Sequence, residues 1–376
     1  MHEGFYRYDQ PATAAHGFFG REILIRSLLD GLRQGRYFAL CGGPKSGRTS
    51  LLLQLMRHEA LRWEREPQAS KVVPVLVDGA LLGARDPRQF ISALWQALNE
   101  AIAHPLVAGS DPRPPTERFD LRRAPKPWAY LQQRCENLWE AMRGRSGWCQ
   151  YALLIDNADA LCRPELEAAA NALNEFIRHA HDAAPLGVVA AGGRALREQG
   201  FDSRAPLAFL RPMALGVLRE SEAAALVRAG LPDIDDEWLR ALLHAAGCHP
   251  YVLVRLLAEI ETHGLEQGFD AIVDAATDDC LGFFAGLWDV FDHRRGVTYR
   301  GAYAAPEHAL MQLVFDYSEG VSLKTAEAEL GIKPLKEYAE FLTYTGVAEM
   351  VMKSGELLLR SRFDLWNVWY NERVMR

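Results

Sequence analysis

The sequence lacks the features that mark several other protein classes. None of its apolar runs approaches 18 residues, and the N-terminus has no basic-then-apolar leader pattern. We therefore expect a cytoplasmic protein without a membrane segment. The cysteines are scattered and form no C-x-x-C pair, which favours free thiols over a zinc site or a disulfide framework. They are Cys41, Cys135, Cys149, Cys162, Cys248 and Cys280.

An excess of positive charge is also missing. The chain of 376 residues carries 42 lysines and arginines against 49 acidic residues, a net charge of −7. This balance excludes a broadly basic nucleic-acid coat, although a local basic patch stays compatible with it. No internal repeat or low-complexity tract is evident, and the length suits two or three domains.

The first half of the chain alternates between strand and helix patterns. Short apolar runs such as "RYFALCG", "KVVPVLVDG", "YALLIDNADAL" and "LGVVAAGG" are separated by segments with helical periodicity. Such alternation predicts an α/β fold with a parallel sheet and helices on both faces. A Pro/Arg-rich stretch at residues 105–127 interrupts the pattern and is expected to form a surface insertion.

The stretch "CGGPKSGRTSLLLQL" nearly matches the phosphate-binding pattern G-x-x-x-x-G-K-[ST]. Glycines in such a loop let successive backbone N–H groups turn towards phosphate oxygens, and the following helix directs its positive end at the same anion. The pattern predicts nucleotide-phosphate binding, with the Thr49 hydroxyl on Mg²⁺. The candidate binding residues are Gly42, Gly43, Pro44, Ser46, Gly47, Arg48, Thr49 and Ser50.

The lysine of that pattern is missing, and Arg48 stands in its place. A lysine is a compact point charge that reaches between the β- and γ-phosphates, whereas an arginine is longer and forked. We expect phosphate binding to be weakened and the positioning of a γ-phosphate to suffer more.

A second motif departs from its pattern in the same way. The apolar run "YALLID" ends in Asp156, a candidate Mg²⁺ ligand, but the next residue is Asn157 where a glutamate would activate water. An amide cannot accept a proton, so slow or absent hydrolysis is predicted. Asp159 is a weaker alternative for that role.

Four stretches in order resemble the signal-transduction ATPases with numerous domains (STAND) of the AAA+ group, especially their bacterial and archaeal branch. They are "FFGREILIRSLL", "GGPKSGRTSLL", "LLIDNAD" and "AAGCHPYVLVRLL". The resemblance implies an ATP- or ADP-controlled switch or scaffold that uses Mg²⁺. It also implies that Gly20 and Arg21 lie beside the adenine, with Pro250 near the base. Arg21 as a solvated residue at a helix start is the alternative.

A phosphate-sensing element would follow "LGVVAAGGRAL". Many AAA+ proteins have Ser, Thr or Asn there, whereas this chain has Gly192 and Gly193. Arg194 is either a γ-phosphate sensor, as in part of the STAND group, or an arginine that faces water.

The sequence predicts three domains: a P-loop core at residues 1–215, a helical lid at 216–292 and a winged helix at 293–376. Lysines on the third helix and the wing of the last domain are offset by acids, which favours a protein-facing role over DNA binding. Two functions remain open. One is an ATP/ADP-binding regulatory or scaffold protein with protein partners or self-assembly. The other is a DNA-associated AAA+ ATPase that uses the winged helix and the basic insertion.

Overall fold

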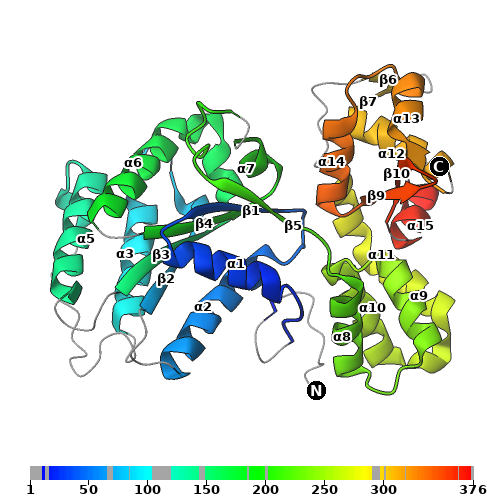
Figure 1. The fold of residues 1–376 in the computed structure, drawn as a ribbon, viewed down its shortest axis with the longest axis horizontal. Coiled ribbons are helices and arrows are strands. Elements are labelled where there is room, and N and C mark those ends of the chain that lie inside the picture. Colours follow the sequence, from blue (N-terminus) through cyan, green and yellow to red (C-terminus); the bar gives the residue numbers. More distant parts are fainter. Residues whose placement is uncertain are drawn as a thin grey trace. The chain divides into compact units, whose positions relative to one another are not determined.

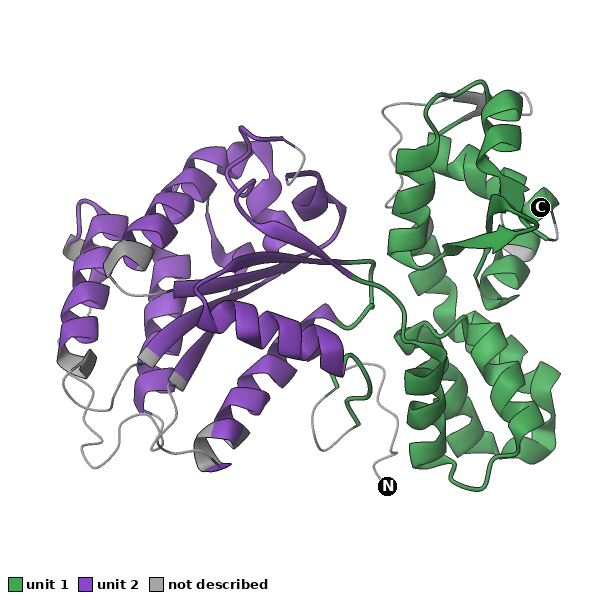
Figure 2. Ribbon diagram, viewed as in Figure 1, with its two compact units in different colours: residues 1–21, 42–47, 215–376 green, residues 22–41, 48–214 purple. Residues whose placement is uncertain are grey.

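The structure is a computed structural model in which contacts divide the chain into two compact units, shown in two colours in Figure 2. Unit 1 comprises residues 1–21, 42–47 and 215–376, and unit 2 comprises residues 22–41 and 48–214. The residues that the structure describes are 11–12, 17–65, 71–83, 85–103, 120–143, 149–183, 186–199, 202–289, 297–299, 302–317, 319–362 and 364–373.

Unit 2 is built on a sheet with the strand order β2-β3-β4-β1-β5 (Figure 1). Three neighbouring pairs, β2–β3, β3–β4 and β4–β1, are parallel, as the strand-helix alternation predicts. The short fifth strand, which ends in unit 1, was not expected from the sequence. The strands are β1 (Tyr37–Gly42), β2 (Lys71–Asp78), β3 (Cys149–Asp156), β4 (Leu186–Gly192) and β5 (Arg211–Leu215).

Helices cover both faces of this sheet because its strands are apolar on both sides (Figure 1). On one face the Gln150 amide of β3 donates a hydrogen bond to the Leu32 carbonyl of α1. The helices of unit 2 are α1 (Glu22–Arg33), α2 (Arg48–Arg65), α3 (Arg88–Ala103), α5 (Pro127–Arg143), α6 (Glu167–Ala183) and α7 (Arg194–Gln199), and the short 3-10 helices are η2 (Gly79–Leu81), η3 (Leu121–Arg123), η4 (Ala158–Cys162) and η5 (Pro164–Leu166).

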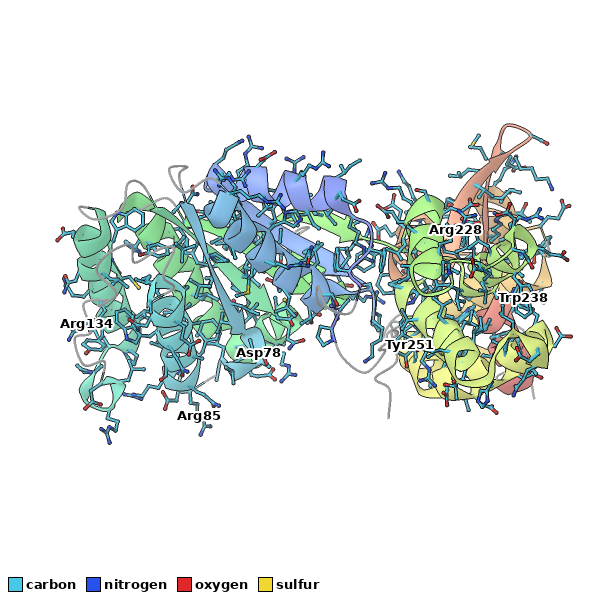
Figure 3. The ribbon with its side chains drawn as sticks, turned by 90° about the horizontal axis from the view of Figure 1, so that it is seen from below. Asp78, Arg85, Arg134, Arg228, Trp238 and Tyr251 are labelled. Atoms are coloured by element: carbon cyan, nitrogen blue, oxygen red, sulfur yellow. The ribbon has the colours of Figure 1, made fainter. Side chains whose placement is uncertain are left out.

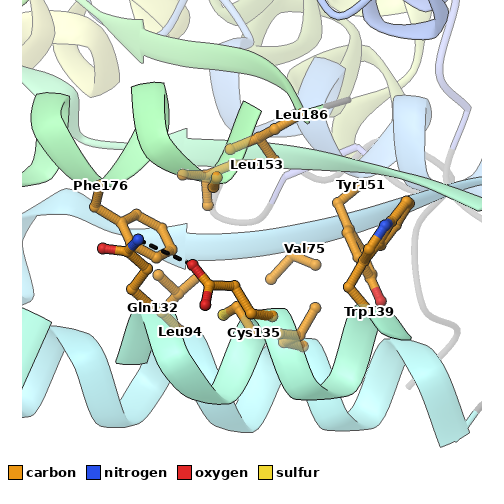
Figure 4. Close-up of a pocket in the computed structure, with 12 residues that line it drawn as sticks. Val75, Leu94, Gln132, Cys135, Trp139, Tyr151, Leu153, Phe176 and Leu186 are labelled. Atoms are coloured by element: carbon orange, nitrogen blue, oxygen red, sulfur yellow. Dashed lines mark hydrogen bonds between the residues drawn. The ribbon is translucent and has the colours of Figure 1, made fainter. Parts of the chain in front are cut away.

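The opposite face packs against α3, α5 and α6 around an apolar cavity of about 70 Å³ (Figure 4). Side chains such as Leu153 of β3 and Phe176 of α6 line it. On α5, the Gln132 amide donates a 3.0 Å hydrogen bond to the Glu136 carboxylate. The cavity is partly open and leaves room for larger side chains.

The structure describes residues 120–127 of the predicted insertion at 105–127, and residues 104–119 lie outside the described residues. Leu121 and Ala124 are buried, and their carbonyls accept hydrogen bonds of 3.2 and 3.3 Å from the Arg88 guanidinium of α3. This part of the stretch therefore belongs to the core and is not a simple surface loop.

Unit 1 begins with helices and ends in a mixed segment (Figure 1). None of the helices in the described part of the chain is long and apolar enough to cross a membrane. The elements are α8 (Glu220–Gly230), α9 (Asp236–Ala246), α10 (Pro250–His263), η6 (Leu265–Gln267), α11 (Phe269–Asp289), β6 (Val297–Tyr299), β7 (Ala302–Ala304), α12 (Pro306–Asp316), β8 (Val321–Ser322), α13 (Leu323–Leu330), α14 (Lys336–Thr345), β9 (Ala348–Lys353), β10 (Glu356–Ser361) and α15 (Asp364–Arg373).

The C-terminal segment, for which the sequence predicts a winged helix, contains the helices α12, α13 and α14, the β9–β10 hairpin and the closing helix α15. The hairpin turn at Ser354 and Gly355 has positive φ at both residues, as a tight turn between β9 and β10 requires. Strand β8 pairs with β10 and extends the hairpin to three strands. Trp366, Trp369 and Tyr370 of α15 are buried and form part of the core of this segment.

Candidate functional site

The phosphate-loop residues 42–47 join β1 to α2 and turn as the glycine pattern predicts. Gly47 has a φ of 88° and Lys45 a φ of 55°. A side chain at Gly43 would not fit, because a Cβ there would lie 2.7 Å from the Thr345 carbonyl oxygen. The Ser46 side chain is buried. The backbone conformation of the loop therefore requires glycine at position 47, and the close packing against Thr345 requires glycine at position 43.

Helix α2 begins directly after the loop, at Arg48. Its first turn reads R-T-S-L and carries no acidic residue. The first N–H groups of a helix have no partner within the helix, and they carry the positive end of its dipole. The start of this 18-residue helix is therefore suited to an anion.

In unit 1, Arg21 is buried and not solvated, which rules out the solvated alternative. Its backbone N–H donates a 2.7 Å hydrogen bond to Glu222, and its guanidinium donates a 3.0 Å bond to the Gly216 carbonyl. A Cβ on Gly47 would lie 2.9 Å from the Arg21 guanidinium, so this group contacts the phosphate loop. Burial lowers the pKa of Arg21 to about 10, which leaves it charged at neutral pH.

Gly20, with a φ of 74°, precedes Arg21 and packs directly against Glu222. The same carboxylate accepts a 3.0 Å hydrogen bond from the Arg219 backbone at the start of α8. Glu222 therefore holds the predicted adenine-side segment against α8, a role that no motif in the sequence indicated.

Pro250 is the first residue of α10, and its neighbour His249 is buried. His249 packs against Phe283 with a ring separation of 5.0 Å. Burial, with smaller contributions from the charges of Arg21 and Arg362, lowers the pKa of His249 to about 3. The structure therefore holds a neutral imidazole beside the predicted lid residue.

The loop carries a lysine at another position. Lys45 lies with its amine 5.5 Å from the centre of the Tyr251 ring, which is labelled in Figure 3. An ammonium group at this distance interacts favourably with an aromatic face. The sequence pattern left Lys45 unassigned because it occupies a variable position of the loop.

In unit 2, Thr49 and Asp156 meet as the metal-site prediction requires. The Thr49 hydroxyl donates a 2.7 Å hydrogen bond to the Asp156 carboxylate. A hydroxyl and a carboxylate are oxygen ligands of the kind that Mg²⁺ prefers, with phosphate oxygens completing the shell. No cluster of three or more His, Cys, Asp or Glu residues with metal-binding geometry occurs among the described residues.

Asn157 occupies the position of the missing glutamate and has a left-handed backbone with a φ of 50°. Its side-chain amide donates a 3.1 Å hydrogen bond to Asp78, which lies at the end of β2 and is labelled in Figure 3. Asparagine adopts this conformation more readily than most residues. Asn157 thus ties β3 to β2 and offers no proton acceptor to water.

Asp159, the weaker alternative for the catalytic base, is engaged elsewhere. One carboxylate oxygen accepts a hydrogen bond from the Gly193 backbone and lies 3.4 Å from the Arg48 guanidinium. The other oxygen accepts a 3.0 Å bond from the Leu196 backbone. These contacts occupy the carboxylate at the start of α7, so the structure does not favour a role in activating water.

Arg194 begins α7 and donates a 2.7 Å hydrogen bond to Glu198 on the same helix. Its side chain is 23% exposed, so it is only partly in contact with water. The ion pair indicates a structural role at the helix start, and a phosphate-sensing role stays a prediction.

The arrangement of strands and helices matches known ATPase structures. The Walker-type ATPase of Pyrococcus abyssi is similar over 97% of this chain and 99% of its own length, with 14% identity and a TM-score of 0.61. The ORC2 protein of Aeropyrum pernix is similar over 94% of each chain, with 13% identity and a TM-score of 0.50. No family model and no curated protein matches the sequence.

A STAND protein of Pyrococcus horikoshii with a tetratricopeptide repeat sensor is also similar, at 13% identity over 97% of this chain and 44% of its own, with a TM-score of 0.36. The chain has the AAA+ P-loop ATPase fold, as the sequence predicts. A shared fold does not by itself assign a function, so the role of this chain has to be argued from its site.

Proposed function

We propose that this protein is a nucleotide-binding regulatory or scaffold member of the AAA+/STAND class that hydrolyses ATP slowly or not at all. The observation that carries this proposal is the 2.7 Å contact between the Thr49 hydroxyl and Asp156, directly after a phosphate loop with an acid-free helix start. These are the groups that a Mg²⁺-nucleotide needs from the chain.

The chain's own groups divide into binding and orienting roles. The N–H groups of the loop and of the first turn of α2 would hold the phosphates, and Thr49 with Asp156 would hold Mg²⁺. Arg21 adds a buried positive charge beside Gly47. Bound Mg²⁺ would supply charge neutralisation at the phosphates. Gly20 and Pro250 remain our candidates for contacts with the adenine.

The proposal of slow or absent hydrolysis is supported by the state of the two side chains that could activate water. Asn157 is an amide that bonds to Asp78, and Asp159 is held by two backbone N–H groups and Arg48. Loss of a general base alone reduces a rate by about 10²–10⁴-fold. Binding without turnover would suit a protein whose nucleotide organises an assembly with partners or with further copies of itself.

Calorimetry with ATP and ADP in the presence of Mg²⁺ tests the binding proposal. We expect heat of binding from the full chain and a large loss of affinity in Asp156→Ala. Asp86→Ala serves as the matched control, because Asp86 is an exposed acid of unit 2, the unit that contains Asp156. Absence of binding heat and of any thermal shift at millimolar nucleotide would contradict the proposal.

DNA binding through the C-terminal segment has less support. Lys336, Lys353 and Arg360 each lie within 4 Å of an acidic side chain, at 3.7, 2.5 and 2.5 Å respectively. Phosphate contacts would have to break these pairs, and they would make the affinity fall steeply with salt. A gel-shift titration with DNA at about 50 and 200 mM salt distinguishes a nucleotide-binding regulator or scaffold from a DNA-associated ATPase. We expect no DNA shift that weakens with salt, whereas such a shift would favour DNA binding.

A further inference from the structure

The carboxylate of Asp159 lies at the carboxyl end of β4, next to the strand that leads into the phosphate loop. Gly192 of β4 pairs with Cys41, the residue before the loop. A Cβ on Gly192 would lie 3.2 Å from the Asp159 carboxyl carbon. Gly192 therefore lets both the Leu196 side chain, 2.8 Å from the same Cβ position, and the Asp159 carboxylate pack closely against the end of β4.

Backbone groups fix this carboxylate in place. Gly193 precedes α7 and has no side chain to cap the helix, and Asp159 supplies the missing acceptor for the N–H groups of Gly193 and Leu196. A side chain held from both oxygens cannot easily turn away when a ligand arrives. Asp159 is therefore a fixed negative charge at the edge of the sheet.

Arg48 is the cation in contact with that charge. Its guanidinium lies 3.4 Å from Asp159, and both side chains are partly buried. In phosphate loops the residue at this position reaches the β- and γ-phosphates. A group that this side chain can touch therefore lies on the γ-phosphate side of the loop. The Asp159 carboxylate therefore neutralises part of the positive charge with which Arg48 would attract the phosphates.

We propose that Asp159 is a specificity-determining residue that makes this site prefer a nucleoside diphosphate over a triphosphate. The inference rests on the proposed nucleotide binding. The third phosphate adds negative charge on the side where Asp159 is fixed, and Arg48 cannot neutralise both groups as well as it neutralises one. A diphosphate leaves the Arg48–Asp159 pair intact and avoids this repulsion.

The expected size follows from one unit charge. A like charge about 4 Å away would change the affinity by about 1,000-fold at an effective dielectric constant of about 20 and by about fivefold in water. Because Arg48 neutralises part of the charge of Asp159, we expect a change in the lower part of this range, on the order of tenfold. Asp156 is a further acid at this edge, but it is directed at Thr49 and would be neutralised by Mg²⁺. Asp159 is therefore the carboxylate whose removal should change the preference between the two nucleotides.

The test is calorimetric titration of the full chain with ADP and with ATP, each with Mg²⁺. The wild type should bind ADP more tightly than ATP. Asp159→Asn, which keeps the shape and removes the charge, should raise the ATP affinity about tenfold more than the ADP affinity. Asp86→Asn, at an exposed acid that pairs with Arg88, should leave the ratio unchanged.

A second measurement needs no variant. Salt screens repulsion as well as attraction, so raising the salt concentration should move the wild-type ATP affinity closer to the ADP affinity. A ratio that moves the other way, or an Asp159→Asn variant that loses affinity for both nucleotides equally, would overturn the inference and leave nucleotide binding intact. Absence of any binding by the wild type would instead contradict the proposed function.

Discussion

Acid should destabilise this protein in a way that depends on one histidine. His249 is 1% exposed, and burial lowers its pKa to about 3, with Arg21 and Arg362 contributing in the same direction. The unfolded chain has an ordinary histidine pKa of about 6.5. Between these two values the unfolded state binds a proton that the folded state does not, so the free energy of unfolding falls as the pH falls below 6.5.

The magnitude follows from these two pKa values. At pH 7.5 the contribution is below about 0.1 kcal/mol, and at pH 5.5 the loss is about 1.4 kcal/mol. Below pH 6.5 the loss approaches about 1.4 kcal/mol per pH unit until the folded-state pKa is reached. A loss of about 1.4 kcal/mol is a large share of the net free energy of unfolding of an ordinary domain.

Urea unfolding of the wild type and of His249→Phe at pH 7.5 and 5.5 measures this effect. The variant keeps a flat ring against Phe283 and cannot take up the proton, so its stability should fall by about 1.4 kcal/mol less than that of the wild type. His244→Asn removes an exposed histidine, 77% accessible, and controls for histidine loss in general. Equal pH dependence in wild type and His249→Phe would refute the reasoning.

Three further outcomes are expected. Trp366→Ala should cost about 3–5 kcal/mol of stability, measured by chemical unfolding, because the indole is fully buried against Phe284 and Trp369. Ala180→Val should raise the melting temperature slightly by filling the cavity between α5 and α6, and a lowered value would show that the cavity is closed in solution. Arg48→Lys combined with Asn157→Glu should give phosphate release above the wild-type level.

The arrangement of the parallel sheet could be predicted from the sequence because buried parallel strands are continuous apolar runs. The predicted strand "LGVVAAGG" matches β4 within one residue. The predicted strand "YALLIDNADAL" begins two residues after the start of β3 and runs five residues past its end at Asp156. Strands β5 and β8 escaped prediction for a physical reason. Both are short, and β8 has only two residues, so their conformation depends on the neighbouring strands more than on their own pattern.

The site could be predicted only where a motif fixes local geometry. The loop glycines and the Thr49–Asp156 pair follow from such motifs. The contacts of Glu222 and Asp159 join residues that are 201 and 34 positions apart, and no local pattern reports a pairing of that kind. For Arg21 the resemblance implied a place beside the adenine, with a solvated residue as the alternative. Its burial excludes that alternative, but its partners Glu222 and Gly216 could not be predicted from the sequence.

Each of the two departures from the ATPase motifs has its own partner in the structure. An aspartate beside Gly192 needs a cation, and the forked, longer Arg48 reaches it from the loop position where lysine would be directed at phosphates. Asn157 bonds to Asp78 from a left-handed backbone, whereas a glutamate there would bring a further negative charge beside Asp78 and Asp156. The residues at these two motif positions thus form contacts that stabilise the carboxyl edge of the sheet without nucleotide. Under the proposed function, such contacts would let the folded state persist both with and without bound nucleotide.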